Sequence, residues 1–128
     1  TQYAFSDSND VAAVCQTAAD NSDVLYIPTD NSAASNTPVI DNICRGNIPV
    51  FCGEEGICAG CGVATLSISY YDIGYKTGKM AADILTGKAD VSAMPIEYAP
   101  EFTKKYNAVT CDALGLTPPD GYEVIAAE

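Results

Sequence analysis

The middle of the chain constrains its fold most, because two short apolar runs there flank a pair of carboxylates. The first run, Ile48 to Cys52, ends at Gly53 and is followed at once by Glu54 and Glu55; the second extends from Val63 to Ile68. Apolar runs of this length, bounded by Gly, are typical of strands that are buried on both faces. Acidic side chains just past such a strand lie at the carboxyl edge of a parallel sheet, where open α/β folds bind ligands. The pattern therefore predicts a ligand site beside the two carboxylates.

Strand and helix patterns alternate along the rest of the chain. This alternation predicts one α/β domain, with a mostly parallel sheet and helices on both faces. Pro38 is expected to restart or kink the second helix, because proline lacks the N–H that a helix interior needs. The expected strands are Gln2 to Phe5, Val24 to Ile27, Ile48 to Cys52 and Val63 to Ile68, with weaker extended segments at Pro95 to Tyr98 and Phe102 to Asn107. The expected helices are Val11 to about Asn21, Ser32 to Arg45, a turn at Ile57 to Gly60, Tyr70 to Thr86 and Ala108 to Leu114, before a loose tail from Pro118.

Composition narrows the class of protein. A chain of 128 residues, with 48% hydrophobic and 18% charged residues, indicates a globular domain with its own core. The net charge of −11 argues against nucleic acid as a partner and against a basic membrane-binding face. The chain contains no His, which excludes a hydrolase built on a Ser–His or Cys–His pair within it. No catalytic residue and no cofactor is therefore predicted.

The cysteines leave three interpretations open. Disulfides are the usual state of several cysteines in an exported protein, and the clustered four are the candidates. Buried free thiols are the second interpretation, for Cys15 and Cys52 in particular, since both fall in helix or strand patterns. A zinc or iron–sulfur site is the third, although the cluster has only one C-x-x-C spacing. The clustered four are Cys44, Cys52, Cys58 and Cys61, and the two outside the cluster are Cys15 and Cys111.

Five segments, in this order, resemble the solute-binding proteins of bacterial ABC importers, in particular the group that binds aromatic amino acids such as tryptophan or tyrosine. They are DVLYIPTDN, IPVFCGEEG, GVATLSISYYDIGYKTGKMAADILTGKA, MPIEY and ALGLTPP. The resemblance implies the type I periplasmic-binding-protein fold, in which two α/β lobes hold the ligand in a cleft between them. Residues 1–128 then correspond mostly to the second lobe, and residues 70–87 to a crossover helix that packs on a first lobe absent from this chain.

The resemblance also implies site residues and partners. The ammonium of an amino acid suits acidic groups, its carboxylate suits hydroxyl and amide groups, and an aromatic side chain suits tyrosine rings. An ABC permease is the implied partner, the implied location is outside the cytoplasm with a lipid anchor, and a chain lacking its first lobe is expected to form a homodimer. The implied ligand-binding residues are Thr29, Asp30, Asn31, Glu54, Glu55, Ser69, Tyr70 and Tyr71.

Each implied site residue also has a purely structural interpretation. Asp30 and Asn31 precede a predicted helix and can cap its first turn. Glu54 and Glu55 precede another helical turn, where the helix dipole favours acidic groups. The small residues of the long helix, Gly74 among them, suit close packing and carry no chemistry. The alternative to an importer component is a ligand-sensing regulatory domain of the same fold.

Overall fold

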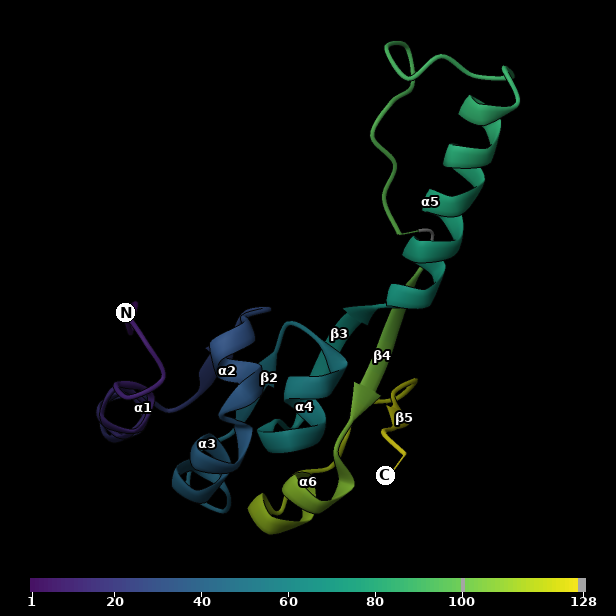
Figure 1. Ribbon diagram of the computed structural model, residues 1–128. Helices are drawn as coiled ribbons and strands as arrows, with labels where there is room; N and C mark the ends of the chain where they lie inside the picture. The colour runs from purple at the N-terminus through teal and green to yellow at the C-terminus, as the bar shows by residue number, and fades with distance from the viewer. Residues whose placement is uncertain (100, 127–128) are drawn as a thin grey trace. The chain divides into compact units, whose positions relative to one another are not determined.

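The computed structural model describes residues 1–99 and 101–126 and divides the chain into two compact units (Figure 1). The first unit comprises Thr1–Ser67 and the chain from Lys104 onward, and the second comprises Ile68–Thr103. The strands are β1 (Leu25–Ile27), β2 (Val50–Cys52), β3 (Ala64–Ile68), β4 (Phe102–Tyr106) and β5 (Glu123–Val124). The helices are α1 (Val11–Asp20), α2 (Asn31–Ser35), α3 (Thr37–Cys44), α4 (Glu55–Cys61), α5 (Tyr70–Leu85) and α6 (Ala108–Leu114).

The strands form one sheet in the order β1-β2-β3-β4-β5. The pairs β1–β2, β2–β3 and β4–β5 are parallel, with Phe51 of β2 opposite both Tyr26 and Ala64. The predicted α/β class with a mostly parallel sheet is therefore confirmed. Parallel neighbours of this kind require crossovers, and α2 to α4 supply them between the first three strands.

The larger of the two buried apolar clusters in the first unit lies on one face of the sheet. In β2, Val50 and Cys52 are buried while Phe51 between them is exposed, because side chains alternate along a strand. α4 packs on β2, and α3 packs against both α1 and α4 (Figure 1). The opposite face leaves Tyr26, Phe51 and Leu66 exposed at 68%, 44% and 55%. The expectation of burial on both faces thus holds for one face only in β2, whereas in β3 both Ala64 and Thr65 are buried.

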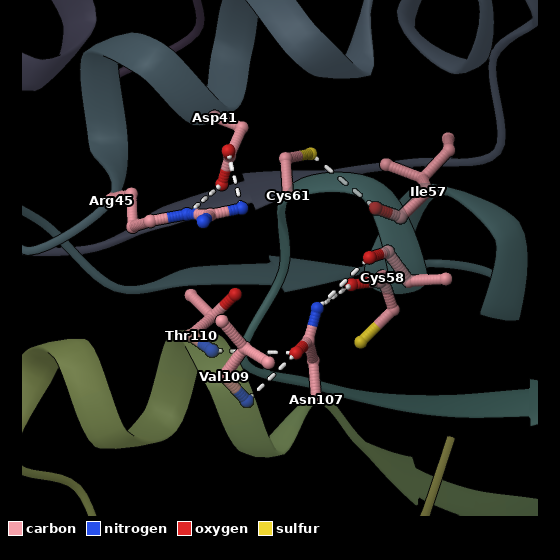
Figure 2. A network of polar contacts seen from close by, with 9 residues as sticks. Asp41, Arg45, Ile57, Cys58, Cys61, Asn107, Val109 and Thr110 are labelled. Carbon is pink, nitrogen blue, oxygen red and sulfur yellow. Dashed lines mark hydrogen bonds and ion pairs between the residues drawn. The ribbon is translucent and has the colours of Figure 1, made fainter. Parts of the chain in front are cut away.

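Asn107 fastens α6 to α4 (Figure 2). Its Nδ2 donates to the carbonyl oxygens of Cys58 and Ala59 at 3.3 and 2.9 Å. Its Oδ1 accepts from the backbone N–H groups of Val109 and Thr110 at 3.1 and 3.3 Å, which caps the first turn of α6. One side chain therefore satisfies the end of one helix and holds it against another.

Two predicted elements of the first unit differ from the observed ones. Gln2 to Phe5 forms no strand; Phe5 instead packs, partly buried, against the core. The helix predicted from Ser32 to Arg45 restarts at Pro38, as expected, because this residue lies in the first turn of α3, where a missing N–H is harmless. The tail predicted to be loose contributes β5, which pairs with β4.

The second unit consists of α5 and the segment that follows it. Ser69 caps α5 by accepting a hydrogen bond from the N–H of Asp72 at 3.1 Å. Lys76 of α5 forms an ion pair with Glu97 at 2.6 Å, and no strand forms at the predicted extended segment around Glu97. None of the residues of α5, all of which the structure describes, is buried. A Cβ added at Gly74 would meet nothing within 4 Å, so the small face of this helix is open in the described chain.

Candidate functional site

The chain segments that leave β1 and β2 touch each other at the carboxyl edge of the sheet. The N–H of Gly53 donates to the carbonyl oxygen of Ile27 at 2.8 Å. A Cβ at Gly53 would lie 2.9 Å from the backbone nitrogen of Thr29 and 3.2 Å from its hydroxyl oxygen, so only glycine allows this approach. The structure therefore brings the predicted residues after β1 beside those after β2.

Asp30 combines a capping role with a carboxylate oxygen that is available to a ligand. It is the N-cap of α2, and its Oδ1 accepts from the N–H of Ala33 at 2.8 Å. The residues that the structure describes give its Oδ2 no donor, and the side chain is exposed. Thr29 and Asn31 on either side are exposed as well. Asp30 can therefore cap the helix and accept a hydrogen bond from a cation at the same time.

Glu54 is more fully engaged with its own helix. It is the N-cap of α4, and its two carboxylate oxygens accept from the N–H groups of Gly56 and Ile57. The capping interpretation is thus confirmed for Asp30, and Glu54, which was expected to favour this turn through the helix dipole, is an N-cap as well. Glu54 is partly buried, so its charge serves the start of α4 and leaves less capacity for a ligand than Asp30 has.

Glu55 influences the pKa of a lysine on β4. It lies in the first turn of α4 and is exposed. A hydrogen bond to Glu123 at 3.0 Å raises the pKa of Lys105 on β4, and the negative charge of Glu55 raises it further. Glu55 therefore contributes to the field at Lys105.

Ser69, Tyr70 and Tyr71, the remaining predicted site residues, belong to the second unit. Ser69 is partly buried and serves as the cap of α5, whereas both tyrosines are exposed. The ring of Tyr71 stacks on that of Tyr75, with centroids 6.4 Å apart and planes inclined by 13°. The predicted tyrosines are therefore accessible aromatic surfaces, and Tyr75 extends this surface by one helical turn.

A hollow of about 350 Å³ on the open face of the sheet was not predicted. It is mainly apolar, because the outward-facing residues of the first three strands form its floor. The sequence signal for this hollow was an aromatic residue at the outward position of β1 and of β2. The same residues also fit strands that are buried on both faces, so the signal did not distinguish an open face from a covered one. The lining residues are Tyr26, Phe51, Cys52, Ala64, Thr65, Leu66 and Tyr122.

The cysteines form two groups of thiols within the first unit. Cys15 and Cys44 have their sulfurs 3.7 Å apart. Hydrogen bonding to the thiols of Cys58 and Cys61, together with burial, raises the pKa of Cys52. All six cysteines are free thiols, and among residues 1–99 and 101–126 no three His, Cys, Asp or Glu side chains are arranged to hold a metal ion. Cys15, placed outside the cluster from the sequence, thus contacts Cys44 of that cluster, and oxidation of the clustered cysteines stays a prediction.

The described helices include none that is long and apolar enough to cross a membrane. A family model described as ABC transporter substrate binding protein matches residues 1–128. The tyrosine-binding protein of Clostridioides difficile strain R20291 is 33% identical over 113 residues, which are 88% of this chain and 32% of that protein.

Two solved structures resemble the chain along almost all of its length. A substrate-binding protein with adhesive properties from Clostridium difficile, in a ligand-free open structure, is 34% identical with a TM-score of 0.75, over 97% of this chain and 43% of that one. An ABC domain from Streptococcus pneumonia in complex with L-Trp is 24% identical with a TM-score of 0.83, over 98% and 45%. The latter shows a shared fold. The chain thus spans less than half the length of each of these three proteins.

Proposed function

Because the chain belongs to the family of ABC transporter substrate-binding proteins, which bind ligands and are not enzymes, we propose that it contributes one side of an amino-acid site in an importer. The family is typically extracytoplasmic. The whole protein would capture its ligand outside the cytoplasm, held there by a lipid anchor, and deliver it to permease subunits.

The observation that carries the proposal is the position of Asp30. Its carboxylate lies at the carboxyl edge of a parallel sheet, beside the segment after β2, with one oxygen available. In our proposal this oxygen receives the ammonium of an amino acid, and the Thr29 hydroxyl lies close enough to bind a polar group of the same ligand. Glu54 supports the site mainly by fixing the start of α4.

The proposed ligand has an aromatic or large apolar side chain. The exposed rings of Tyr70 and Tyr71 offer surfaces for such a side chain, since aromatic rings stack favourably. Two relatives support this choice: one is a tyrosine-binding protein, and the other was solved with L-Trp. The remaining contacts would come from parts of the protein beyond this chain, in the proposed first lobe.

The test is isothermal titration calorimetry of the full-length protein with tyrosine, tryptophan and phenylalanine. Asp30→Asn removes the charge but keeps the helix cap, because Asn caps as well as Asp. We expect affinity to fall by about 10- to 150-fold, the equivalent of roughly 1.5–3 kcal/mol for a charge-assisted hydrogen bond. Glu54→Gln should weaken binding less, since both of its oxygens already accept hydrogen bonds in the helix cap.

Asp112→Asn on α6 is the matched control, because it removes an exposed aspartate from the same unit but from another helix. Its affinity should equal that of the wild type. Wild-type affinity in Asp30→Asn would show that the ammonium site lies elsewhere, and no heat with any amino acid would overturn the proposed ligand class.

A further inference from the structure

Cys15 and Cys44 are brought together by the packing of two helices that are distant in sequence. Cys15 lies four residues after the buried Val11 of α1, and Cys44 lies four after the buried Ile40 of α3. Residues four apart share one face of a helix, so both sulfurs point into the contact between α1 and α3. Their separation is 3.7 Å across a sequence distance of 29 residues. Closing this gap to a covalent bond requires a sulfur movement of about 1.7 Å, within reach of side-chain rotation.

The two thiols differ in accessibility and acidity in a way that suits oxidation. Cys15 is only partly buried, whereas Cys44 is 1% exposed, so Cys15 is the more accessible thiol of the pair. The hydrogen bond between the two thiols lowers the pKa of Cys15, while the same contact and burial raise the pKa of Cys44. Thiolates are the attacking species in disulfide exchange, so Cys15 reacts first and Cys44 resolves the intermediate.

The other four thiols are less accessible to an oxidant than Cys15. Cys52, Cys58 and Cys61 are 3%, 0% and 1% exposed, and the first two sulfurs lie against Gly62. Cys61 donates to the carbonyl oxygen of Ile57 in its own helix (Figure 2). Cys111 is buried and directs its thiol to a carbonyl oxygen of the main chain. An oxidant that cannot enter the core therefore discriminates between Cys15 and the rest.

We propose that Cys15 and Cys44 form the disulfide of the oxidised protein, which ties α1 to α3, while the other four cysteines remain thiols. The oxidant is a disulfide, such as oxidised glutathione. Cys15 attacks one of its sulfurs and releases a first thiol; Cys44 then attacks the Cys15 sulfur and releases the second. The protein loses two electrons and two protons, and the oxidant becomes two thiols. The disulfide closes a long loop in the unfolded chain, so it stabilises the folded state whichever ligand the protein binds.

The test is oxidation of the reduced protein with oxidised glutathione, followed by alkylation under denaturing conditions and mass spectrometry. No Lys or Arg lies between the two cysteines, so trypsin leaves both in one peptide, which should be lighter by two hydrogens and unalkylated. Cleavage before aspartate, for example at Asp23 and Asp30, should separate them into two linked peptides. The melting temperature should rise by roughly 5–15 °C on oxidation, as expected for a loop of this length.

Cys15→Ala should abolish this rise, and the matched variant Cys111→Ala should keep it, because Cys111 lies outside the pair. Both substitutions leave Cys44 in place; because Cys111 is itself buried, each variant's oxidised form is compared with its own reduced form. Six alkylated cysteines after oxidation, a linked pair without Cys15, or a glutathione adduct that persists on Cys15 would each overturn the proposal.

Discussion

Gly62, between α4 and β3, offers a direct test of how tightly the buried thiols pack. A Cβ at this position would overlap the sulfur of Cys52 and lie 3.0 Å from Cα and 3.2 Å from Sγ of Cys58. Favourable carbon contacts occur at about 3.5–4.0 Å, so the backbone of α4 would have to move by about 0.5–1 Å. The φ of Gly62 is −98°, which any residue adopts, so Gly62→Ala introduces no backbone strain in the folded state.

The expected loss follows from two opposing contributions. Overpacking in a dense core typically costs about 1–3 kcal/mol of unfolding free energy, while replacing Gly by Ala returns about 0.4–1 kcal/mol through the unfolded state. We therefore expect Gly62→Ala to lower the free energy of unfolding by about 0.5–2.5 kcal/mol. For a urea dependence of about 2 kcal/mol per molar, the unfolding midpoint falls by roughly 0.3–1.3 M.

Urea unfolding followed by circular dichroism measures this midpoint. Gly78→Ala in α5 is the matched control, because a Cβ there meets nothing within 4 Å and Ala favours a helix. The midpoint of this control should equal or exceed that of the wild type. If Gly62→Ala is as stable as the wild type with an unchanged slope, the thiols around Gly62 are less tightly packed than we have argued.

Two further outcomes follow from exposed and capping residues. Asn107→Ala should lower the free energy of unfolding by about 1–2 kcal/mol, because it removes both the α6 cap and the link to α4. Asn107→Asp keeps the cap of α6 and loses only the hydrogen-bond donor to α4, so its stability in urea unfolding should lie between those of the wild type and Asn107→Ala. Equal stability of the wild type and both variants would contradict this role of Asn107. Light scattering of the 128-residue chain at micromolar concentration should show self-association, because Tyr26, Phe51 and Leu66 leave an apolar sheet face in water. Phe51→Glu should weaken this association, and a wild-type monomer would contradict it.

Local sequence patterns determined which elements form and where most of them begin. The 16-residue α5 was predicted to within one residue, since Ser69 provides a cap and the pattern continues to the stop at Gly87. β1 to β3 followed from short apolar runs, and the parallel sheet from their alternation with helices. The Asp30 cap was also foreseen, because Asp just before a helix satisfies its first N–H groups, whereas Glu54 was expected there only for its charge near the helix dipole. These features depend on a few neighbouring residues, and so they are present in the sequence itself.

Tertiary structure decided which surfaces are covered and which distant residues meet. β5 pairs with β4, so no local pattern marked it, and the strand predicted at Gln2 to Phe5 does not form. A short apolar strand has the same sequence pattern whether one of its faces or both are buried. For this reason the exposure of Phe51 was not foreseen. Cys15 meets Cys44 because α1 packs on α3, a contact between helices far apart in sequence. Such contacts depend on how whole elements pack against each other, so they cannot be predicted from the spacing of residues along one element.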